Sequence, residues 1–253
     1  NLLGKRVLVR VDWNVPIING EVVDDFRIAK SLKTIKYLTD AGAKVILCTH
    51  LEPEGLSVEP LKKFVPEGVD LLENLRRNPG EKTNEESFAK ELASKADIFV
   101  NDAFSVSHRA HASIVGVPKF LPSFAGFGFM DEVENLSKAF NPKHPFLFIL
   151  GGAKFETKLP LVKKFESIAD SIFIAGANAK PALEMGFANV PNITLPVGDV
   201  SATDLTEENL EILKDKISKA EFVVWNGPLG KYEEGLKAGT LKLAKMLGES
   251  GKE

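Results

Sequence analysis

The sequence is poor in cysteine and in long apolar runs. Cys48 is the only cysteine among 253 residues, so no internal disulfide can form, which is typical of a reducing compartment such as the cytoplasm. The longest apolar run, residues 146–150, is far too short to span a bilayer, and no secretion signal opens the sequence. The net charge of −3, from 32 basic and 35 acidic residues, argues against general binding to nucleic acid or to a membrane surface.

Arginine is absent from the second half of the sequence. All six arginines lie within the first 109 residues, and lysine alone follows: Arg6, Arg10, Arg27, Arg76, Arg77 and Arg109. Arginine binds carboxylate and phosphate with a planar fork of donors, whereas lysine acts as a mobile point charge. The distribution predicts that the two halves hold different anionic ligands, and chance among six residues is the alternative.

Short apolar runs alternate with helix-like segments, which predicts an α/β fold with mostly parallel strands. Residues 5–15 alternate apolar and polar positions and predict a strand with one polar face, and a helix is expected at 26–39. Further strands are predicted at 43–48, 69–72, 97–100, 146–150, 171–174 and 221–225. The segment 52–67 contains three prolines and is short for a β-α-β crossover.

A change of organisation is expected between residues 120 and 145. The proline- and glycine-rich stretch 117–128 leads into a predicted helix at 131–140, and a new strand follows. The expected architecture is two Rossmann-like lobes with mostly parallel sheets, joined by a hinge helix. Its expected parts are a first lobe at 1–128, a linker helix and hinge at 129–145, and a second lobe at 146–253.

Polar side chains follow four predicted strands of the first half, where ligands of open parallel sheets bind. These are Asp12 and Asn14 after the first strand, His50 after the second, Arg76 after the third, and Asn101, Asp102 and Arg109 after the fourth. Together they predict a site for a small molecule rich in carboxylate or phosphate. Ordinary turns and caps are the alternative. For Arg27, a solvated ion pair with Asp24 or Asp25 at a helix start is equally compatible with the sequence.

The histidines do not predict a metal site. His50, His108 and His111 have no carboxylate or thiol at zinc-ligand spacing, and His144 stands between prolines in an expected loop.

Strands of the second half run into small-residue turns, where a backbone can approach a phosphate closely. The turns contain Gly151 and Gly152, then Gly176, then Asn226 and Pro228, and neither a Walker motif nor GxGxxG is present. Lys154 and Lys158 are four apart, so on a helix they would share a face and repel by about 0.2–0.5 kcal/mol unless an anion lay between them. Solvated surface lysines are the alternative.

Taken in order, these segments resemble the phosphoglycerate kinase family. The matching strings are VRVDWNVP (9–16), DDFR (24–27), LLENLR (71–76), VNDAF (100–104), HRAHAS (108–113), GGAK (151–154) with Lys158, and WNGP (225–228). The resemblance spans nearly the whole sequence. It implies reversible phosphoryl transfer between 1,3-bisphosphoglycerate and ADP, giving 3-phosphoglycerate and ATP in glycolysis. It also implies Mg²⁺ carried by the nucleotide, a monomer, and a cytoplasmic location.

The resemblance implies roles for individual residues. Catalytic roles fall on Arg27, Lys154 and Lys158. Phosphoglycerate binding falls on Asp12, Asn14, Arg27, His50, Arg76 and Arg109. Nucleotide binding falls on Gly151, Gly152, Lys154, Lys158, Gly176, Asn226, Pro228 and Glu233. No residue is assigned to a metal, and closure of the lobes at 117–128 and 131–140 is expected to bring the two ligands together.

The sequence departs from the family pattern in three places. After His50 the family has Gly-Arg-Pro, whereas residues 51–54 read Leu-Glu-Pro-Glu, so an arginine is replaced by acidic residues. Connections near 52–68 and 185–200 are shorter, and the Gly-Gly-Gly-Asp turn expected of the family does not occur. Two hypotheses follow: an active kinase whose polypeptide contains further segments, or a truncated or inactive relative that binds phosphoglycerate. A Rossmann oxidoreductase would need a glycine fingerprint that is absent.

Overall fold

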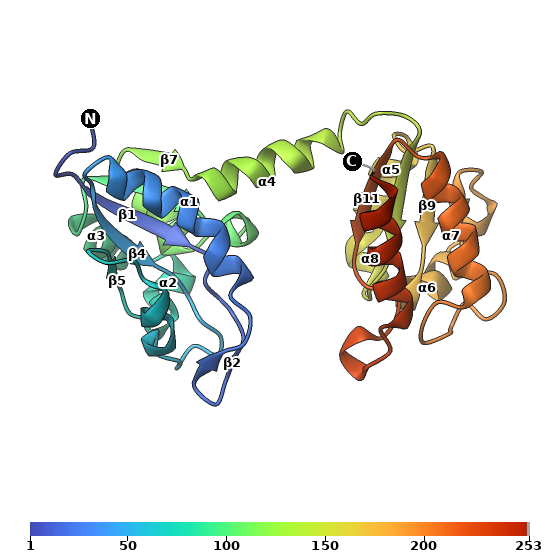
Figure 1. Cartoon of the computed structure of the whole chain (residues 1–253), viewed down its shortest axis with the longest axis horizontal. Coiled ribbons are helices and arrows are strands. Elements are labelled where there is room, and N and C mark those ends of the chain that lie inside the picture. Colours follow the sequence, from blue (N-terminus) through green and yellow to red (C-terminus); the bar gives the residue numbers. More distant parts are fainter. Residues whose placement is uncertain (252–253) are drawn as a thin grey trace. The chain divides into compact units, whose positions relative to one another are not determined.

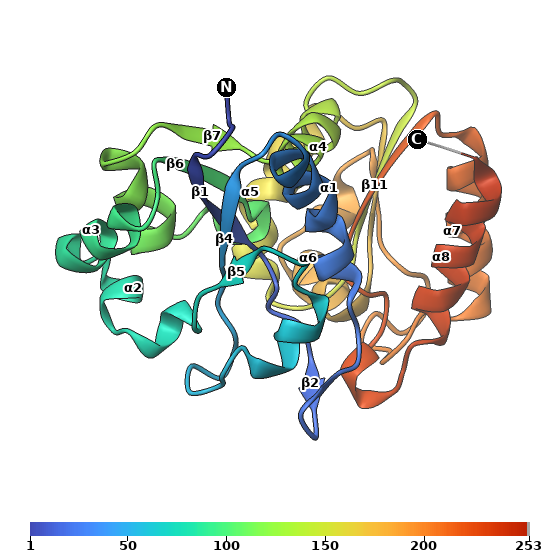
Figure 2. The same ribbon diagram turned by 60° about the vertical axis from the view of Figure 1, so that its left-hand side comes forward.

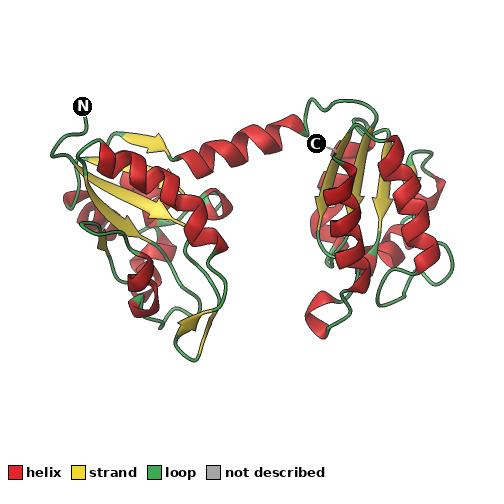
Figure 3. Ribbon diagram, in the orientation of Figure 1, coloured by secondary structure: helices red, strands yellow, loops and turns green. Residues whose placement is uncertain are grey.

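The computed structural model describes residues 1–251, and the chain divides into two compact units, Asn1–Leu136 and Ser137–Glu253. Each unit contains a parallel sheet, with strands drawn in yellow among red helices in Figure 3. The predicted α/β class with two Rossmann-like lobes is confirmed by these sheets and by the helices on their faces. Within the described residues, no helix has both the length and the apolar character needed to cross a bilayer.

The first unit is built on a five-stranded sheet in the order β5-β4-β1-β6-β7, with every neighbouring pair parallel. Its strands are β1 (Arg6–Val11), β4 (Lys44–Cys48), β5 (Asp70–Leu71), β6 (Ile98–Asp102) and β7 (Ser123–Ala125), and a separate antiparallel pair comprises β2 (Ile17–Ile18) and β3 (Glu21–Val22). Successive strands are added first on one side of β1 and then on the other. The order therefore reverses between β1 and β6, which is where ligands of such sheets bind.

Helices cover both faces of this sheet. The helices are α1 (Phe26–Asp40), α2 (Gly80–Thr83) and α3 (Glu86–Ser94), with 3-10 turns at Glu59–Phe64, Leu75–Arg77, Phe104–Val106 and Val117–Lys119 and a π-helical turn at Ala112–Gly116. Val7 and Val9 of β1 share an apolar cluster with Ile35 of α1. Leu8, which points the other way, shares one with Leu92 of α3. Figure 2 shows α1 and α3 on opposite sides of β1 and β4.

The second unit repeats this plan with four parallel strands in the order β10-β9-β8-β11. Figure 1 shows helices lying against this second sheet. Its elements are β8 (Phe146–Leu150), α5 (Phe155–Glu166), β9 (Ser171–Ile174), α6 (Ala179–Glu184), β10 (Ile193–Thr194), α7 (Glu207–Lys219), β11 (Phe222–Asn226) and α8 (Ala238–Ser250), with 3-10 turns at Gly176–Asn178, Phe187–Asn189 and Tyr232–Glu234. Phe148 packs with Phe165 of α5, whereas Ile149 packs in the cluster of Leu213 of α7 and Leu243 of α8. The strand order reverses between β8 and β11.

Helix α4 (Phe127–Lys138) begins before the predicted start at 131 because two side chains of the first unit accept its first free N–H groups. Thr34 Oγ1 accepts from Phe127 N and Asp102 Oδ1 accepts from Phe129 N, both at 2.9 Å. The division between the units falls within α4.

The structure differs from the sequence predictions at several places in the first unit. The strand predicted at 5–15 ends at Val11, and the face predicted to be polar is buried at Arg10, which is 1% exposed. Strand β7 was missed because it lies in the proline- and glycine-rich stretch. The crossover at 52–67 contains a 3-10 helix, Glu59–Phe64, in place of a full α-helix.

Candidate functional site

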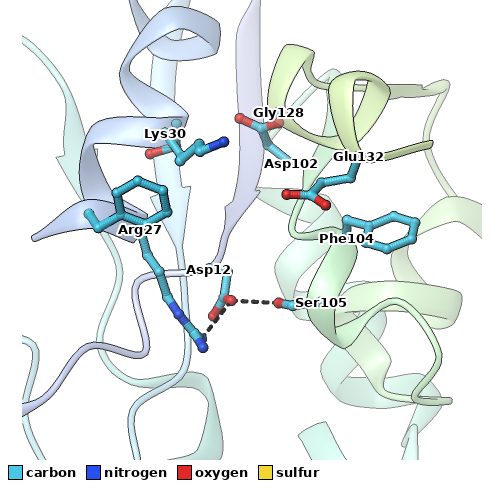
Figure 4. A pocket seen from close by; sticks show the side chains of 10 residues that line it. Asp12, Arg27, Lys30, Asp102, Phe104, Ser105, Gly128 and Glu132 are labelled. Atoms are coloured by element: carbon cyan, nitrogen blue, oxygen red, sulfur yellow. Dashed lines mark hydrogen bonds and ion pairs between the residues drawn. The ribbon is translucent and has the colours of Figure 1, made fainter. Parts of the chain in front are cut away.

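The first unit brings Asp12, Arg27 and Ser105 together beside the carboxyl ends of β1 and β6. Asp12 follows β1, and its Oδ2 accepts from Arg27 Nη1 at 2.9 Å and from Ser105 Oγ at 2.5 Å. Figure 4 shows Arg27 and Ser105 reaching Asp12 from different sides. These residues line a pocket of about 430 Å³ with Asp102 and Glu132. The second carboxylate oxygen, Asp12 Oδ1, is buried without a hydrogen-bond partner among the described residues.

Arg27 reaches this pocket from the first turn of α1. Asp24 Oδ1 accepts from Phe26 N at 2.9 Å, so Asp24 caps the start of α1, and Asp25 makes no side-chain cap. The carboxylate that pairs with Arg27 is Asp12. The alternative of a local ion pair with Asp24 or Asp25 is therefore not what the structure shows.

A group of cationic and imidazole side chains, here called the arginine basin, lies next to Asp12. Its members are Arg10, His50, Arg76, Arg109 and His111, and the positive charges of the three arginines act on both histidines. Asp12 lies close enough to act on Arg76, which connects the basin to the pocket. The structure thus gathers Asp12, Arg27, His50, Arg76 and Arg109 around one region of the first unit.

His50 is a neutral member of this basin. Arg10 Nη2 lies 3.0 Å from His50 Nδ1. Because arginine only donates, Nδ1 is the acceptor and the proton resides on Nε2. Burial, followed by the positive charges of Arg10, Arg76 and Arg109, lowers the pKa of His50 to about 2. His50 is therefore a neutral hydrogen-bond donor at neutral pH.

Arg10 is held by a buried network that the sequence did not reveal. Its Nε donates to Ser113 Oγ at 2.9 Å, and Ser113 Oγ donates to Glu81 Oε1 at 2.6 Å. Glu81 is fully buried, and it also lies 3.7 Å from His111 Nδ1. The negative charge of Glu81 therefore offsets part of the positive charge of Arg10, which it reaches through Ser113.

Asn14 and Arg76 both contact Glu52. Asn14 Oδ1 accepts from Glu52 N at 3.0 Å, and Arg76 Nη1 donates to the Glu52 carboxylate. The side chain of Arg76 is 3% exposed, and burial lowers its pKa, with the charges of Arg109 and Arg10 contributing. The carboxylate of Glu52 therefore faces the arginine basin through Arg76.

In the second unit, the turns after β8 and β11 approach one another closely. Gly151 N donates to Asn226 O at 2.7 Å, and Gly152 N donates to Pro228 O at 2.6 Å. A Cβ on Gly151 would lie 2.3 Å from Pro228 O, so only glycine fits there. Gly176 also lies next to the carbonyl of Pro228, since a Cβ on Gly176 would be 3.3 Å from Pro228 O. These five residues converge at the switch point of the second sheet.

Lys158 points back toward this turn from the first part of α5. Its Nζ donates to Gly151 O at 2.8 Å, and Asn178 Nδ2 donates to the same oxygen at 2.7 Å. Burial lowers the pKa of Lys158. Asn178 is fully buried, and its Oδ1 has no partner within the described part of the chain. Sequence reasoning missed Asn178, although its position after the Gly176 turn is a signal.

The spacing of Lys154 and Lys158 would place them on one face if both were in a helix, but the structure does not place Lys154 in α5. It precedes α5, with a positive φ of 62°, and its side chain is exposed. Such a backbone conformation is uncommon for residues other than glycine and places Lys154 at the end of the turn.

A pocket of about 990 Å³ opens beside these turns. Gly152, Lys158 and Pro228 line it together with Glu233, which comes from the 3-10 turn Tyr232–Glu234. Lys154, Asn226, Gly151 and Gly176 are not among its lining residues. The pocket has room for a mononucleotide-sized ligand.

Two doubly wound units, one presenting arginines and the other a lysine in a glycine-lined turn, suit a phosphotransferase that binds an anionic ligand in each unit. The profile of "Phosphoglycerate kinase" matches residues 1–65 and 56–190. Phosphoglycerate kinase of Finegoldia magna is 36% identical over 334 residues, covering 99% of this chain and 85% of that protein. That of Fervidobacterium nodosum is 36% identical over 330 residues, covering 98% and 82%. The chain belongs to the phosphoglycerate kinase family.

Solved structures lead to the same family. The structure of phosphoglycerate kinase from Coxiella burnetii has a TM-score of 0.82 at 29% identity, and that from Pyrococcus horikoshii OT3 has 0.85 at 25%. Each match covers 100% of this chain and 85% of the solved chain. The alignment with the Finegoldia protein is longer than the 253 residues of this chain, so that relative contains internal residues without a counterpart here.

Proposed function

We propose that the protein transfers a phosphoryl group between 1,3-bisphosphoglycerate and ADP, with phosphoglycerate bound by the first unit and nucleotide by the second. The observation that carries this division is that each unit gathers its own anion-binding groups at its own switch point. Arginine forks suit the carboxylate and phosphate of a glycerate, whereas the glycine turns and Lys158 suit nucleotide phosphates. Membership of the family supplies the reaction.

In the first unit, Arg76, Arg109 and the Nε2–H of His50 are proposed to donate to the phosphate and carboxylate of 3-phosphoglycerate. Asp12 is proposed to accept from a hydroxyl of the glycerate, since Asp12 Oδ1 is a buried acceptor without a partner among the described residues. Asn14 is proposed to assist at the same end. Arg27 is proposed to lie beside the group that is transferred.

In the second unit, Lys158 and Lys154 are proposed to neutralise the nucleotide phosphates, and Gly151, Gly152 and Gly176 to allow their close approach. Asn226 and Pro228 are proposed to border the phosphates, and Glu233 to accept from the ribose. Mg²⁺ enters as part of the nucleotide substrate.

The chemistry needs no covalent intermediate. A β-phosphate oxygen of ADP attacks the acyl phosphorus of 1,3-bisphosphoglycerate, the bond to the carboxyl oxygen breaks, and the products are ATP and the 3-phosphoglycerate carboxylate. Arg27 and Lys154 are proposed to stabilise the charge on the equatorial oxygens. The reaction requires the two ligands to meet with water excluded, so the two units must close on one another. We assign the hinge of this closure to the linker segment 129–145.

The test is titration of the purified protein with 3-phosphoglycerate and with Mg·ADP, separately and together, combined with a coupled assay for transfer. Binding of both ligands with turnover is expected. Binding of phosphoglycerate without nucleotide binding or turnover would instead indicate the non-catalytic module, which gains no support from the comparisons. We further propose a cytoplasmic monomer, to be checked by fractionation of the source cells and by sedimentation.

A further inference from the structure

The carboxylate of Glu52 pairs with Arg76 at the edge of the arginine basin. The side chain of Arg76 is 3% exposed, whereas that of Glu52 is 54% exposed, so the pair joins a buried guanidinium to a carboxylate facing solvent. Arg76 Nε is buried and makes no hydrogen bond to the described residues. Arg76 therefore meets one carboxylate and keeps a spare donor.

The backbone around Glu52 is fixed from two sides. Asn14 Oδ1 accepts from Glu52 N at 3.0 Å. Asn74 bonds to the backbone of residues 51–56 four times, accepting from Leu51 N at 3.0 Å and donating to the carbonyls of Leu51, Glu54 and Leu56 at 3.2, 3.1 and 2.9 Å. Release of Arg76 therefore requires only a rotation of the Glu52 side chain, which is already half exposed.

The neighbouring acidic residue behaves differently. Glu54 Oε1 accepts from Lys82 Nζ at 2.5 Å, and both side chains are about half exposed. That pair is a solvated surface ion pair outside the basin. Glu52 and Glu54 thus offer a matched comparison: the same residue type in the same loop, with and without contact to a buried arginine.

We propose that Glu52 is a built-in carboxylate competitor for Arg76, which the anionic substrate must displace, and that it sets the affinity and charge selectivity of the first unit. This inference rests on the proposed function, which assigns Arg76 to phosphoglycerate. A substrate with several negative charges gains enough from the basin to exchange one charged hydrogen bond for another. A singly charged carboxylate gains little, because Glu52 already provides the same group.

The experiment compares the wild type, Glu52→Gln and Glu54→Gln in titrations with 3-phosphoglycerate and with inorganic phosphate, followed by assay. Glu52→Gln keeps an acceptor for Arg76 but removes the charge, so both ligands should bind about tenfold more tightly. The KM for 3-phosphoglycerate should fall with kcat little changed. Glu54→Gln should match the wild type in every measurement, and thermal denaturation should confirm that both variants fold.

Unchanged or weaker phosphate binding by Glu52→Gln would overturn the proposal, as would equal tightening in Glu54→Gln. If Glu52→Gln fails to fold, Glu52→Asp, whose shorter carboxylate meets Arg76 less well, is expected to tighten phosphate binding in the same direction. If no protein binds 3-phosphoglycerate, the proposed function fails, and the inorganic phosphate titration still decides the role of Glu52.

Discussion

Arg27 Nη1 donates to Asp12 Oδ2 at 2.9 Å, so the first turn of α1 is tied to the carboxyl end of β1. Ser105 donates to the same oxygen. The side chain of Arg27 is 53% exposed, so its guanidinium is accessible to a ligand while the contact with Asp12 holds it in position. A group that stabilises charge during phosphoryl transfer needs both properties.

Replacement of Arg27 by alanine should therefore reduce turnover by about 10³-fold or more, while 3-phosphoglycerate still binds measurably. The physical reason is that the charge on the transferring group would lose a donor used in the transition state. The measurement is kcat in the coupled assay, with the Kd for 3-phosphoglycerate from calorimetry.

Arg6→Ala is the control for this variant. Arg6 pairs with Asp97 at 2.7 Å at the opposite end of β1, with both side chains partly exposed. Its turnover should equal that of the wild type, and full activity of Arg27→Ala would refute the role proposed for Arg27.

Lys158→Ala should weaken ADP binding and leave 3-phosphoglycerate binding nearly unchanged, because Lys158 belongs to the second unit and bonds to Gly151 O. Separate titrations with the two ligands give the answer. Lys163→Ala, an exposed position on the same helix α5, should bind ADP as the wild type does. Equal losses for both ligands would contradict the division of labour between the units.

Gly151→Ala should abolish ADP binding and lower the free energy of unfolding by about 1–3 kcal/mol. Its Cβ would lie 2.3 Å from Pro228 O and 2.6 Å from Gly227 O, which are backbone atoms that cannot yield without separating β8 from β11. Urea unfolding and ADP titration measure both effects. Gly248→Ala is the control, since its Cβ in α8 would meet nothing within 4 Å. A fully stable Gly151→Ala protein would show that the turn tolerates a side chain.

The pH dependence of stability should reflect His50. Its pKa is about 2 in the folded protein against 6.5 for the ordinary group, so below pH 6.5 the unfolded chain takes up the proton first. The contribution of His50 to the free energy of unfolding is therefore fully present above pH 6.5 and decreases as the pH falls. The unfolding equilibrium constant should rise by up to about tenfold per pH unit.

Urea unfolding between pH 5 and pH 8 tests this expectation. His50→Gln removes the titrating imidazole and should flatten the slope, although loss of the Arg10 contact lowers its stability at every pH. A slope identical to that of the wild type would assign the effect to another group.

The sequence predicted most of the architecture because its strands are marked either by apolar and polar alternation, as in β1, or by a continuous apolar run, as in β8. Strands β8 and β9 have the predicted bounds, and the helix expected at 26–39 differs from α1 by one residue. Two-residue strands such as β10 carry too few positions for a period to be detected.

The candidate site was predictable to the extent that its residues follow strands directly. Asp12 and Gly151 were found in this way. The burial of Arg10 was not, because alternation distinguishes polar from apolar positions but does not tell which polar positions have a buried partner such as Ser113. The contact of Glu52 with Arg76 was also hidden, because it depends on how Asn14 and Asn74 fold the loop.

The carbonyl oxygen of Gly151 accepts from both Lys158 and Asn178, so both of its lone pairs are engaged. A Cβ on Gly152 would lie 2.9 Å from Lys158 Nζ, so the ammonium group occupies the space that a side chain at residue 152 would take. A larger residue at 152 would therefore displace Lys158 Nζ from the Gly151 carbonyl, and the missing side chain at 152 is what allows this lysine to reach the turn.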